Sequence, residues 1–164
     1  MLQYVLNKKN QSLNRGFTLI ELLVVTVVVG ILAAISLPSL LAQVGKARET
    51  EASSQLGTVG RSQQAYHFEI QTFAPDMNSL GQIVNVVDGY YDFPDPIIAN
   101  NSLVKHQAIA DAPYNVSSRN FSVGVYHNLG SYVLVVCRAV APTASVTAPD
   151  TPTESCSNNG VAIK

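Results

Sequence analysis

Residues 15–22 read Arg15-Gly16-Phe17-Thr18-Leu19-Ile20-Glu21-Leu22, and an apolar run continues from there to Leu41. Glu21 is the only charged side chain between Gly16 and Gly45. Placing an ionisable group at membrane depth costs free energy, so a carboxylate in such a run indicates a function. This stretch therefore guides the interpretation of both the fold and the role of the chain.

The apolar run is long enough to cross a bilayer. The segment from Leu22 to Leu41 carries no charge, and at 1.5 Å per residue a helix of that length spans roughly 30 Å. Lys8, Lys9 and Arg15 precede the run, so the positive-inside rule places the N-terminus in the cytoplasm and the bulk of the chain outside. Without these three, 7 of the 10 basic residues remain against 11 acidic ones, so we expect no specific binding of nucleic acid.

Three kinds of N-terminal signal fit a basic segment followed by an apolar run. A secretory signal peptide would be cleaved after the run, where Ala34-Ile35-Ser36 is an acceptable site. A plain signal anchor would stay uncut, but neither of these two signals explains Glu21. A leader that is cut between Gly16 and Phe17 would leave the apolar run, with its carboxylate, at the start of the mature protein.

The stretch from Arg15 to Leu22, with the apolar residues that follow it up to Pro38, resembles the prepilin signature of type IV pilins and of the related pseudopilins. The resemblance implies that a prepilin peptidase removes residues 1–16 and that the new amino terminus at Phe17 is N-methylated. It also implies an inner-membrane location before assembly, help from the pilus assembly machinery, and then a helical filament outside the cell, an extracellular pilus on the cell surface. A less specific similarity, carried by residues 61–66 and by Phe73, is to cyanobacterial pilins.

Glu21 lies four residues after Phe17, one helical turn away on the same face. Cleavage after Gly16 would free an α-ammonium group at Phe17, and a carboxylate in an apolar setting is much less costly when it is paired with a cation. By resemblance to the pilins, the partner is the ammonium group of a neighbouring subunit, and this pair sets the axial register of assembly. The alternative is that Glu21 only complements the macrodipole at the start of its helix.

Gly30 and Pro38 interrupt the same helix. Proline removes a backbone hydrogen bond, and glycine lowers helix stability by about 1 kcal/mol relative to alanine. One interpretation is a kink that a transmembrane helix tolerates. The other, which the resemblance implies, is local melting between these two residues in the filament, which would make the helix flexible there.

Beyond the run, the sequence predicts an α+β fold in which a long N-terminal helix packs on a small antiparallel β-sheet. A helical stripe of apolar and large residues follows spacings of three and four: Ala52, Leu56, Val59, Gln63, Tyr66 and Ile70. Alternation on both sides of Asn128-Leu129-Gly130 predicts a β-hairpin, Asp88-Gly89 predicts a turn between strands, and the residues from Pro96 to about Asn120 read as a polar loop. The expected organisation is a leader (1–16), a transmembrane and filament-core helix (17–41), an amphipathic helix (42–72) and a globular β-rich region (73–164).

Cys137 and Cys156 both lie on the predicted outer side of the membrane. An even number of cysteines in an exported domain favours a disulfide bond, with two unpaired thiols as the alternative. The pair brackets residues 139–153, whose composition is that of a loop. A disulfide-bounded loop of this kind either clamps the last strand or, as the resemblance to pilins implies, forms an exposed surface for contacts or adhesion.

Motifs for catalysis or cofactor binding do not occur in the sequence, and we expect neither a cofactor nor a metal. His67, His106 and His127 are scattered without the spacing of metal ligands. The sequence therefore predicts a structural subunit, not an enzyme, that polymerises with identical or related pilin subunits and supports motility, adhesion or DNA uptake. One alternative is a pseudopilin of a type II secretion system. Another is a membrane-anchored periplasmic binding protein or enzyme, in which the Gly16-Phe17 bond would stay uncut.

Overall fold

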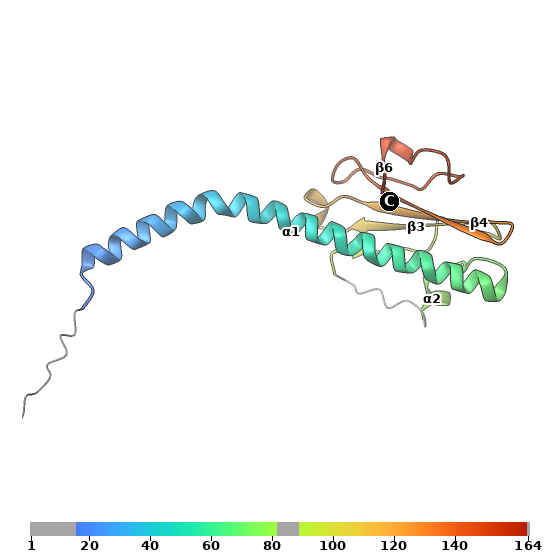
Figure 1. Cartoon of the computed structure of the whole chain (residues 1–164), viewed down its shortest axis with the longest axis horizontal. Coiled ribbons are helices and arrows are strands. Elements are labelled where there is room, and N and C mark those ends of the chain that lie inside the picture. The colour runs from blue at the N-terminus through green and yellow to red at the C-terminus, as the bar shows by residue number, and fades with distance from the viewer. Residues whose placement is uncertain (1–15, 82–88, 164) are drawn as a thin grey trace, which may run out of the picture. The chain divides into compact units, whose positions relative to one another are not determined.

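The computed structural model describes residues 16–81 and 89–163 (Figure 1). Helix α1 (Leu19–Ile70) is continuous and covers nearly all of residues 17–72, which the sequence predicted to be helical. The chain divides after Ser39 into two compact units, so the first part of α1 belongs to one unit and the second part to the other. We call the second unit, residues 40–163, the head.

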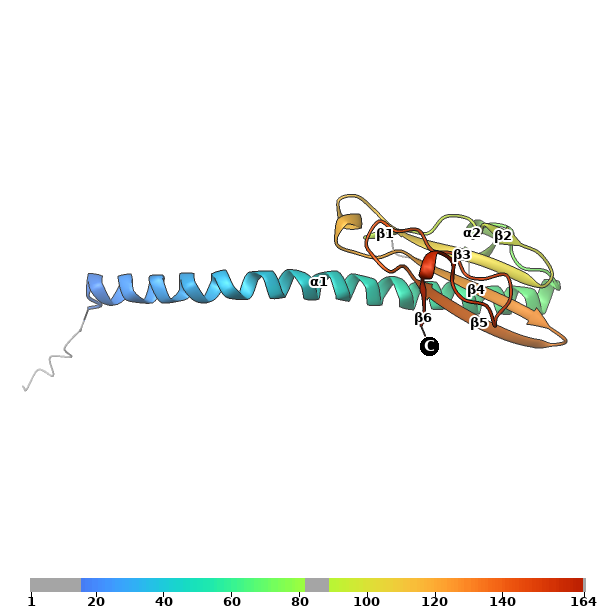
Figure 2. The same cartoon turned by 90° about the horizontal axis from the view of Figure 1, so that it is seen from above.

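The head contains an antiparallel sheet with the strand order β1-β3-β4-β5-β6, and β2 also pairs with β3 (Figure 2). The strands are β1 (Tyr91–Asp92), β2 (Ile98–Ala99), β3 (Leu103–Ala110), β4 (Phe121–Asn128), β5 (Ser131–Arg138) and β6 (Val161–Ile163). The short helices are α2 (Met77–Leu80), η1 (Tyr114–Val116) and η2 (Ser157–Asn159). The α+β fold expected from the sequence is thus present.

The hairpin of β4 and β5 confirms the strongest strand prediction. Asn128 pairs with Ser131 at its tip, and both residues between them have left-handed backbone angles, with φ of 47° at Leu129 and 84° at Gly130. Glycine adopts such an angle without steric cost, which explains its position in this two-residue loop.

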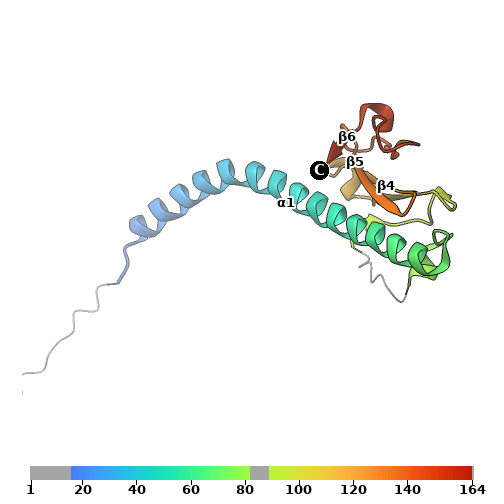
Figure 3. The same cartoon turned by 45° about the vertical axis from the view of Figure 1, so that its right-hand side comes forward.

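The sheet of the head lies between helix α1 and the loop that follows β5 (Figure 3). Side chains of β4 point alternately to these two layers. Phe121 and Val123 pack toward α1, while Ser122 and Tyr126 form hydrogen bonds with the loop. We call this segment, residues 139–160, the C-terminal loop. Because both faces are covered, the first six residues of β4 are all buried, and the strand lacks the exposed polar face of a two-layer structure.

The core between α1 and the sheet is small and apolar. Ala52 and Leu56 of the helix meet Ala108, Phe121 and Val123 of the strands, and all five are at most 2% exposed. Burying a leucine side chain such as Leu56 contributes about 1.5–3 kcal/mol to folding. This packing holds the second part of α1 on the sheet.

The predicted helical stripe is correct over most of its length and wrong at its end. Ile70 is 55% exposed, whereas His67, which was not part of the stripe, is 2% exposed. The His67 imidazole lies 2.8 Å from the Tyr132 hydroxyl and 2.9 Å from the carbonyl of Asn101. The last turn of α1 therefore packs through hydrogen bonds and ring contacts, which a pattern of apolar residues does not detect.

Strand β3 corrects the prediction of a polar loop up to about Asn120. It is the central partner of β1, β2 and β4, although three of its side chains are polar. Each of these finds a partner: Lys105 pairs with Asp150, His106 lies beside Gln63, and Gln107 donates to the carbonyl of Val146. The polar composition that resembled a loop is therefore that of a buried strand in which each polar side chain has a partner, although the Nδ1 atom of His106 has none among the described residues.

Part of the predicted turn and strand before β1 lies outside the described residues. This holds for residues 82–88, and so for the turn expected at Asp88-Gly89. Within the described chain, the β-structure of this stretch is limited to the two residues of β1, Tyr91 and Asp92.

A buried polar pair beneath α1 makes the stability of the head depend on pH. The Gln63 side chain accepts from the backbone N–H of Ala74 at 2.8 Å and donates to its carbonyl at 3.1 Å. Its Nε2 atom also lies 2.8 Å from Nε2 of His106. Because Ala74 fixes the orientation of this amide, the imidazole nitrogen must accept, and a protonated His106 would place two donors against each other.

We expect the head to lose stability as the pH falls from about 6.5 toward 4. Burial lowers the pKa of His106 from 6.5 to about 4, although the Asp95 carboxylate opposes the shift. The unfolded chain therefore binds a proton in this interval that the folded head excludes, and the full contribution is present only above pH 6.5. The expected loss is at most about 3 kcal/mol, measured by denaturant unfolding in detergent at both pH values.

A His106→Gln variant is the control for this pH dependence. Its amide oxygen still accepts from Gln63, but the side chain does not titrate. The part of the slope between pH 6.5 and 4 that is due to His106 should disappear in the variant. An unchanged slope would assign the pH dependence to other groups.

Candidate functional site

The N-terminal end of α1 carries Glu21 in a defined hydrogen-bonded arrangement. The backbone N–H and the hydroxyl of Thr18 both donate to Oε2 of Glu21, at 2.9 and 2.8 Å. In return, the backbone N–H of Glu21 lies 3.2 Å from the Thr18 hydroxyl oxygen and donates to it. This reciprocal pattern is a capping box, which satisfies donors that the first turn of a helix leaves without partners.

The capping box was missed in the sequence, although its signal is present. Thr18 and Glu21 have the spacing of a Ser/Thr-x-x-Glu motif ahead of an apolar run. Oε2 of Glu21 makes both contacts, whereas Oε1 has no hydrogen-bond partner within residues 16–81 and 89–163. The carboxylate can therefore cap its own helix and still accept a hydrogen bond from another chain.

The first part of α1 exposes its apolar side chains on every side. Leu19, Ile20 and Ile31 are 84%, 67% and 60% exposed. α1 contains an 18-residue window with a mean hydropathy of 2.7, of which no residue is buried, so this helix could cross a membrane by length and composition. A helix that is apolar all round needs lipid or other helices as its environment.

Gly30 and Pro38 lie within this helix without ending it. The Ser36 hydroxyl donates to the carbonyl of Leu32 at 2.8 Å, and the Thr26 hydroxyl donates to the carbonyl of Leu23 at 2.8 Å. Since Pro38 has no N–H, the carbonyl of Ala34 lacks its usual helical partner. The segment is therefore helical, with one backbone hydrogen bond fewer than a regular helix.

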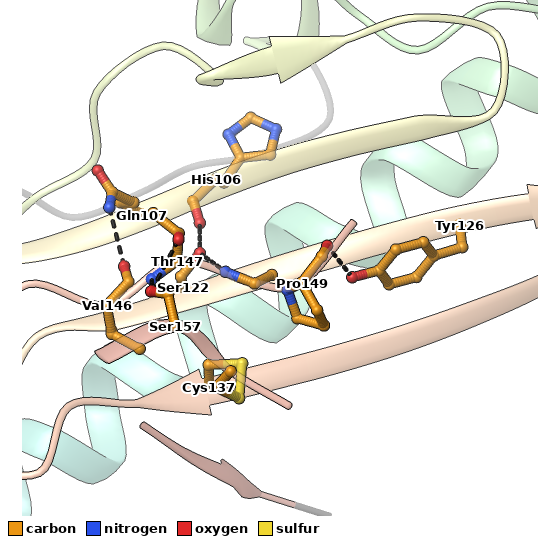
Figure 4. Close-up of a disulfide and its surroundings, with 11 residues drawn as sticks. His106, Gln107, Ser122, Tyr126, Cys137, Val146, Thr147, Pro149 and Ser157 are labelled. Atoms are coloured by element: carbon orange, nitrogen blue, oxygen red, sulfur yellow. Dashed lines mark hydrogen bonds between the residues drawn. A yellow bond between two sulfur atoms is a disulfide. The ribbon is translucent and has the colours of Figure 1, made fainter. Parts of the chain in front are cut away.

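The C-terminal loop is closed by the disulfide between Cys137 and Cys156 that the sequence favoured (Figure 4). The side chains of Val146 and Ala148 are each 1% exposed and form a second small core with the two cysteines. The loop therefore packs on the sheet, which supports the interpretation as a clamp, while its turn at residues 150–155 is exposed.

Side chains of the sheet hold the backbone of the C-terminal loop. Ser122 donates to the carbonyl of His106 and accepts from the N–H of Ala148, as Figure 4 shows. On the same face, the Tyr126 hydroxyl donates to the carbonyl of Pro149 at 2.6 Å. These bonds replace the regular hydrogen bonds that an irregular segment cannot make with itself.

The structure corrects one expectation about the histidines. His67 and His127, described as scattered, lie side by side with ring centroids 4.4 Å apart and ring planes tilted by 42°, and both contact Tyr132. His106 remains separate, beside Gln63. Within the described residues, no group of three or more His, Cys, Asp or Glu side chains is arranged to hold a metal ion.

Residues 49–160 match the protein family described as Type IV pilin-like G and H, which covers more than half of the chain. The chain belongs to this family. Residues 11–37 of this type IV pilin-like chain also match the prokaryotic N-terminal methylation motif. The resemblance to type IV pilins and the α+β pilin fold, both inferred from the sequence, are thereby confirmed.

Several curated pilins are similar to part of this type IV pilin-like chain. The type IV major pilin protein PilA of Myxococcus xanthus is 35% identical over 68 residues, which are 42% of this chain and 31% of that protein. The type IV wide pilus major component PilA4 of Thermus thermophilus is 35% identical over 66 residues, 40% of this chain and 50% of that protein. The type IV major alpha-pilin of Moraxella bovis is 41% identical over 58 residues, 35% of this chain and 36% of that protein. The chain thus spans half or less of the length of these three relatives.

Proposed function

We propose that this type IV pilin-like chain is a structural subunit of a type IV pilus and polymerises through the first part of α1. The observation that carries the proposal is an apolar helix with no buried residue in its most hydropathic window, which begins at a capped carboxylate. An exposed surface of this kind is stable only against lipid or against like helices. Membership of the pilin-like family and the methylation motif support a change of environment, in which the helix lies first in lipid and then against the same helix of other subunits.

The proposed mechanism begins with cleavage between Gly16 and Phe17. Phe17 follows this bond, and Thr18 then begins the capping box, so cleavage leaves a free amine one residue before the helix cap. N-methylation of that amine keeps its positive charge. Oε1 of Glu21 then accepts from the amine of a neighbouring subunit, while Oε2 keeps the cap. The apolar side chains supply cohesion, and the ion pair sets the register.

The proposed location follows the same order. Residues 1–16 are the leader, residues 17–41 hold the subunit in the inner membrane with its N-terminus in the cytoplasm, and residues 42–164 lie outside. After extraction, residues 17–41 form the core of the extracellular filament. The missing hydrogen bond at Pro38, together with Gly30, would let this segment lengthen under tension. In this role the protein acts by assembly and not by catalysis.

Gly16→Leu is expected to block processing. A peptidase that requires a small residue before the scissile bond cannot accommodate the branched side chain, so the full-length precursor should accumulate in the membrane. The parent should give a mature protein that starts at Phe17, as determined by N-terminal mass spectrometry. Gly16→Ala is the matched control because it adds a single methyl group, and it should retain most of the processing.

The function as a whole is tested by purifying surface filaments and sequencing their subunits. We expect filaments that contain the chain from Phe17 onward and that are lost on its deletion. A mature chain that still begins at Met1 would contradict the proposal and favour an anchored periplasmic protein. Processing without surface filaments would instead favour a pseudopilin.

A further inference from the structure

Four basic side chains lie around α1 at the end of the head that follows the apolar run: Lys46, Arg48, Arg119 and Arg138. Three of them, together with Glu49, line a hollow of about 550 Å³ beside α1, which we call the basic groove. Arg48 is two residues, or about 200° of helical rotation, from Lys46. It therefore lies on the opposite flank of α1, where it lines a second hollow with Glu51. In these two hollows, four cations accompany two carboxylates.

The carboxylate of the basic groove is already engaged. Glu49 accepts from the backbone N–H of Arg119 at 3.1 Å and lies 3.6 Å from its Nη1 atom. In the described part of the chain, Lys46, Arg48 and Arg138 make no ion pair. Among the same residues, the buried Nε atoms of Arg48, Arg119 and Arg138 have no hydrogen-bond partner. Guanidinium groups with unused donors favour an oxyanion, such as a phosphate group, as partner.

Tyrosine rings and an exposed apolar side chain accompany these cations. The guanidinium group of Arg48 lies 4.5 Å from the ring centroid of Tyr90 and 4.4 Å from that of Tyr114. Tyr114 begins η1, and Val116 at the end of η1 is 74% exposed. Tyrosine is enriched where proteins meet the membrane–water interface, and basic side chains extend there toward the polar layer. This end of the head thus has the composition of an interfacial surface.

The position of the basic groove along α1 indicates which anion is close to it. Leu41 ends the uncharged run, and Lys46 follows five residues later in the same helix, a rise of about 7.5 Å. The headgroup layer on each side of the hydrocarbon core is about 5–8 Å thick. With residues 22–41 across the core, Lys46 lies at the outer edge of that layer, and Glu49, which holds Arg119, lies about 12 Å beyond Leu41. Long basic side chains at these levels extend to the headgroup phosphates.

We propose that the basic groove binds the phosphate group of an anionic phospholipid while the subunit is in the inner membrane. The lipid belongs to the leaflet on the side of the head. Lys46 and Arg138 supply the charges that are free of partners in the described chain, and η1 enters the interface through Val116. The contact holds the head against the bilayer and has to be released when the subunit leaves the membrane for a filament. The inference rests on the proposed function, because it assigns a lipid contact to the membrane-inserted subunit.

The first test counts the lipids that the purified full-length chain retains in a non-ionic detergent, by native mass spectrometry during titration with phosphatidylglycerol or phosphatidylcholine. The parent should bind one phosphatidylglycerol about tenfold more tightly than phosphatidylcholine, whose choline cation is repelled by the groove. Lys46→Gln/Arg138→Gln should remove this preference. Arg61→Gln, which deletes an exposed cation of α1 outside the groove, is the matched control and should keep it. An intact disulfide shows in each variant that the head has folded.

The second test measures where the head lies relative to the headgroups. The chain contains no tryptophan, so Val116→Trp and Phe68→Trp each introduce a single reporter at a position that is 74% exposed. In vesicles of equal parts phosphatidylglycerol and phosphatidylcholine, a lipid with a nitroxide on its headgroup should quench the fluorescence of Val116→Trp. Phe68→Trp should not be quenched, because Phe68 lies about 40 Å beyond Leu41 along α1.

The outcomes separate this inference from the proposed function. Equal retention of phosphatidylglycerol by the parent and by Lys46→Gln/Arg138→Gln would overturn the lipid site, as would equal quenching of the two tryptophan variants. Displacement of the lipid by an equal concentration of inorganic phosphate would also overturn it and would make the groove a site for free phosphate. Neither test depends on cleavage or on filaments. An absence of surface filaments would therefore contradict the proposed function alone.

Discussion

Glu21→Gln is expected to abolish filament assembly while processing and folding continue. A glutamine at this position still offers an oxygen to the N–H and the hydroxyl of Thr18, so the capping box remains. Only the negative charge is lost. If the charge sets the register against the amine of Phe17, the filament yield should fall at least tenfold, since a charged pair fixes alignment more than it adds cohesion.

Thr18→Ala is the matched variant that keeps the charge and removes the cap. It deletes the hydroxyl that binds Oε2 of Glu21 and accepts from its N–H, which lowers the stability of a helix end by about 1 kcal/mol. This variant should be processed and should assemble at a yield close to that of the parent. Filament mass per cell and the N-terminal sequence of the subunit measure both effects. If the alanine variant fails and the glutamine variant assembles, Glu21 acts only as a helix cap.

The parts of the structure that the sequence predicted correctly are those held by local signals. The apolar run and the stripe through Leu56 have the helical period, and the two strands around Leu129 alternate on either side of a short loop. Both patterns come from residues close in sequence, so the helix and the hairpin could be predicted without knowledge of their tertiary contacts. The even number of cysteines and their predicted location outside the membrane were likewise sufficient to predict the disulfide.

The parts that were missed depend on distant partners. β3 has a polar sequence and becomes a central strand because its polar side chains find partners in two distant segments: Gln63 in α1, and Val146 and Asp150 in the C-terminal loop. His67 replaces Ile70 at the end of the stripe for the same reason, since Tyr132 lies 65 positions away. No local pattern contains these contacts. The cap on Glu21 is different, because its motif is local and was available in the sequence.

Replacing both cysteines by serine, Cys137→Ser/Cys156→Ser, is expected to lower the free energy of unfolding of the head by about 3 kcal/mol in the chain-entropy model. The disulfide joins residues 19 positions apart, so its removal frees a loop of that size in the unfolded chain. Denaturant unfolding of the full chain in detergent, with and without reductant, measures the loss. Reductant should destabilise the parent and leave the variant unchanged.

Ser122→Ala separates the contribution of the disulfide from that of the hydrogen bonds beneath the C-terminal loop. It leaves the buried N–H of Ala148 without its acceptor, which costs about 1–3 kcal/mol while the loop stays closed by the disulfide. Because the disulfide prevents the loop from leaving, this cost should shrink in the double-serine background, where the loop can move away and hydrate the freed N–H. Equal costs in both backgrounds would mean that the hydrogen bonds alone hold the loop and that the disulfide acts elsewhere.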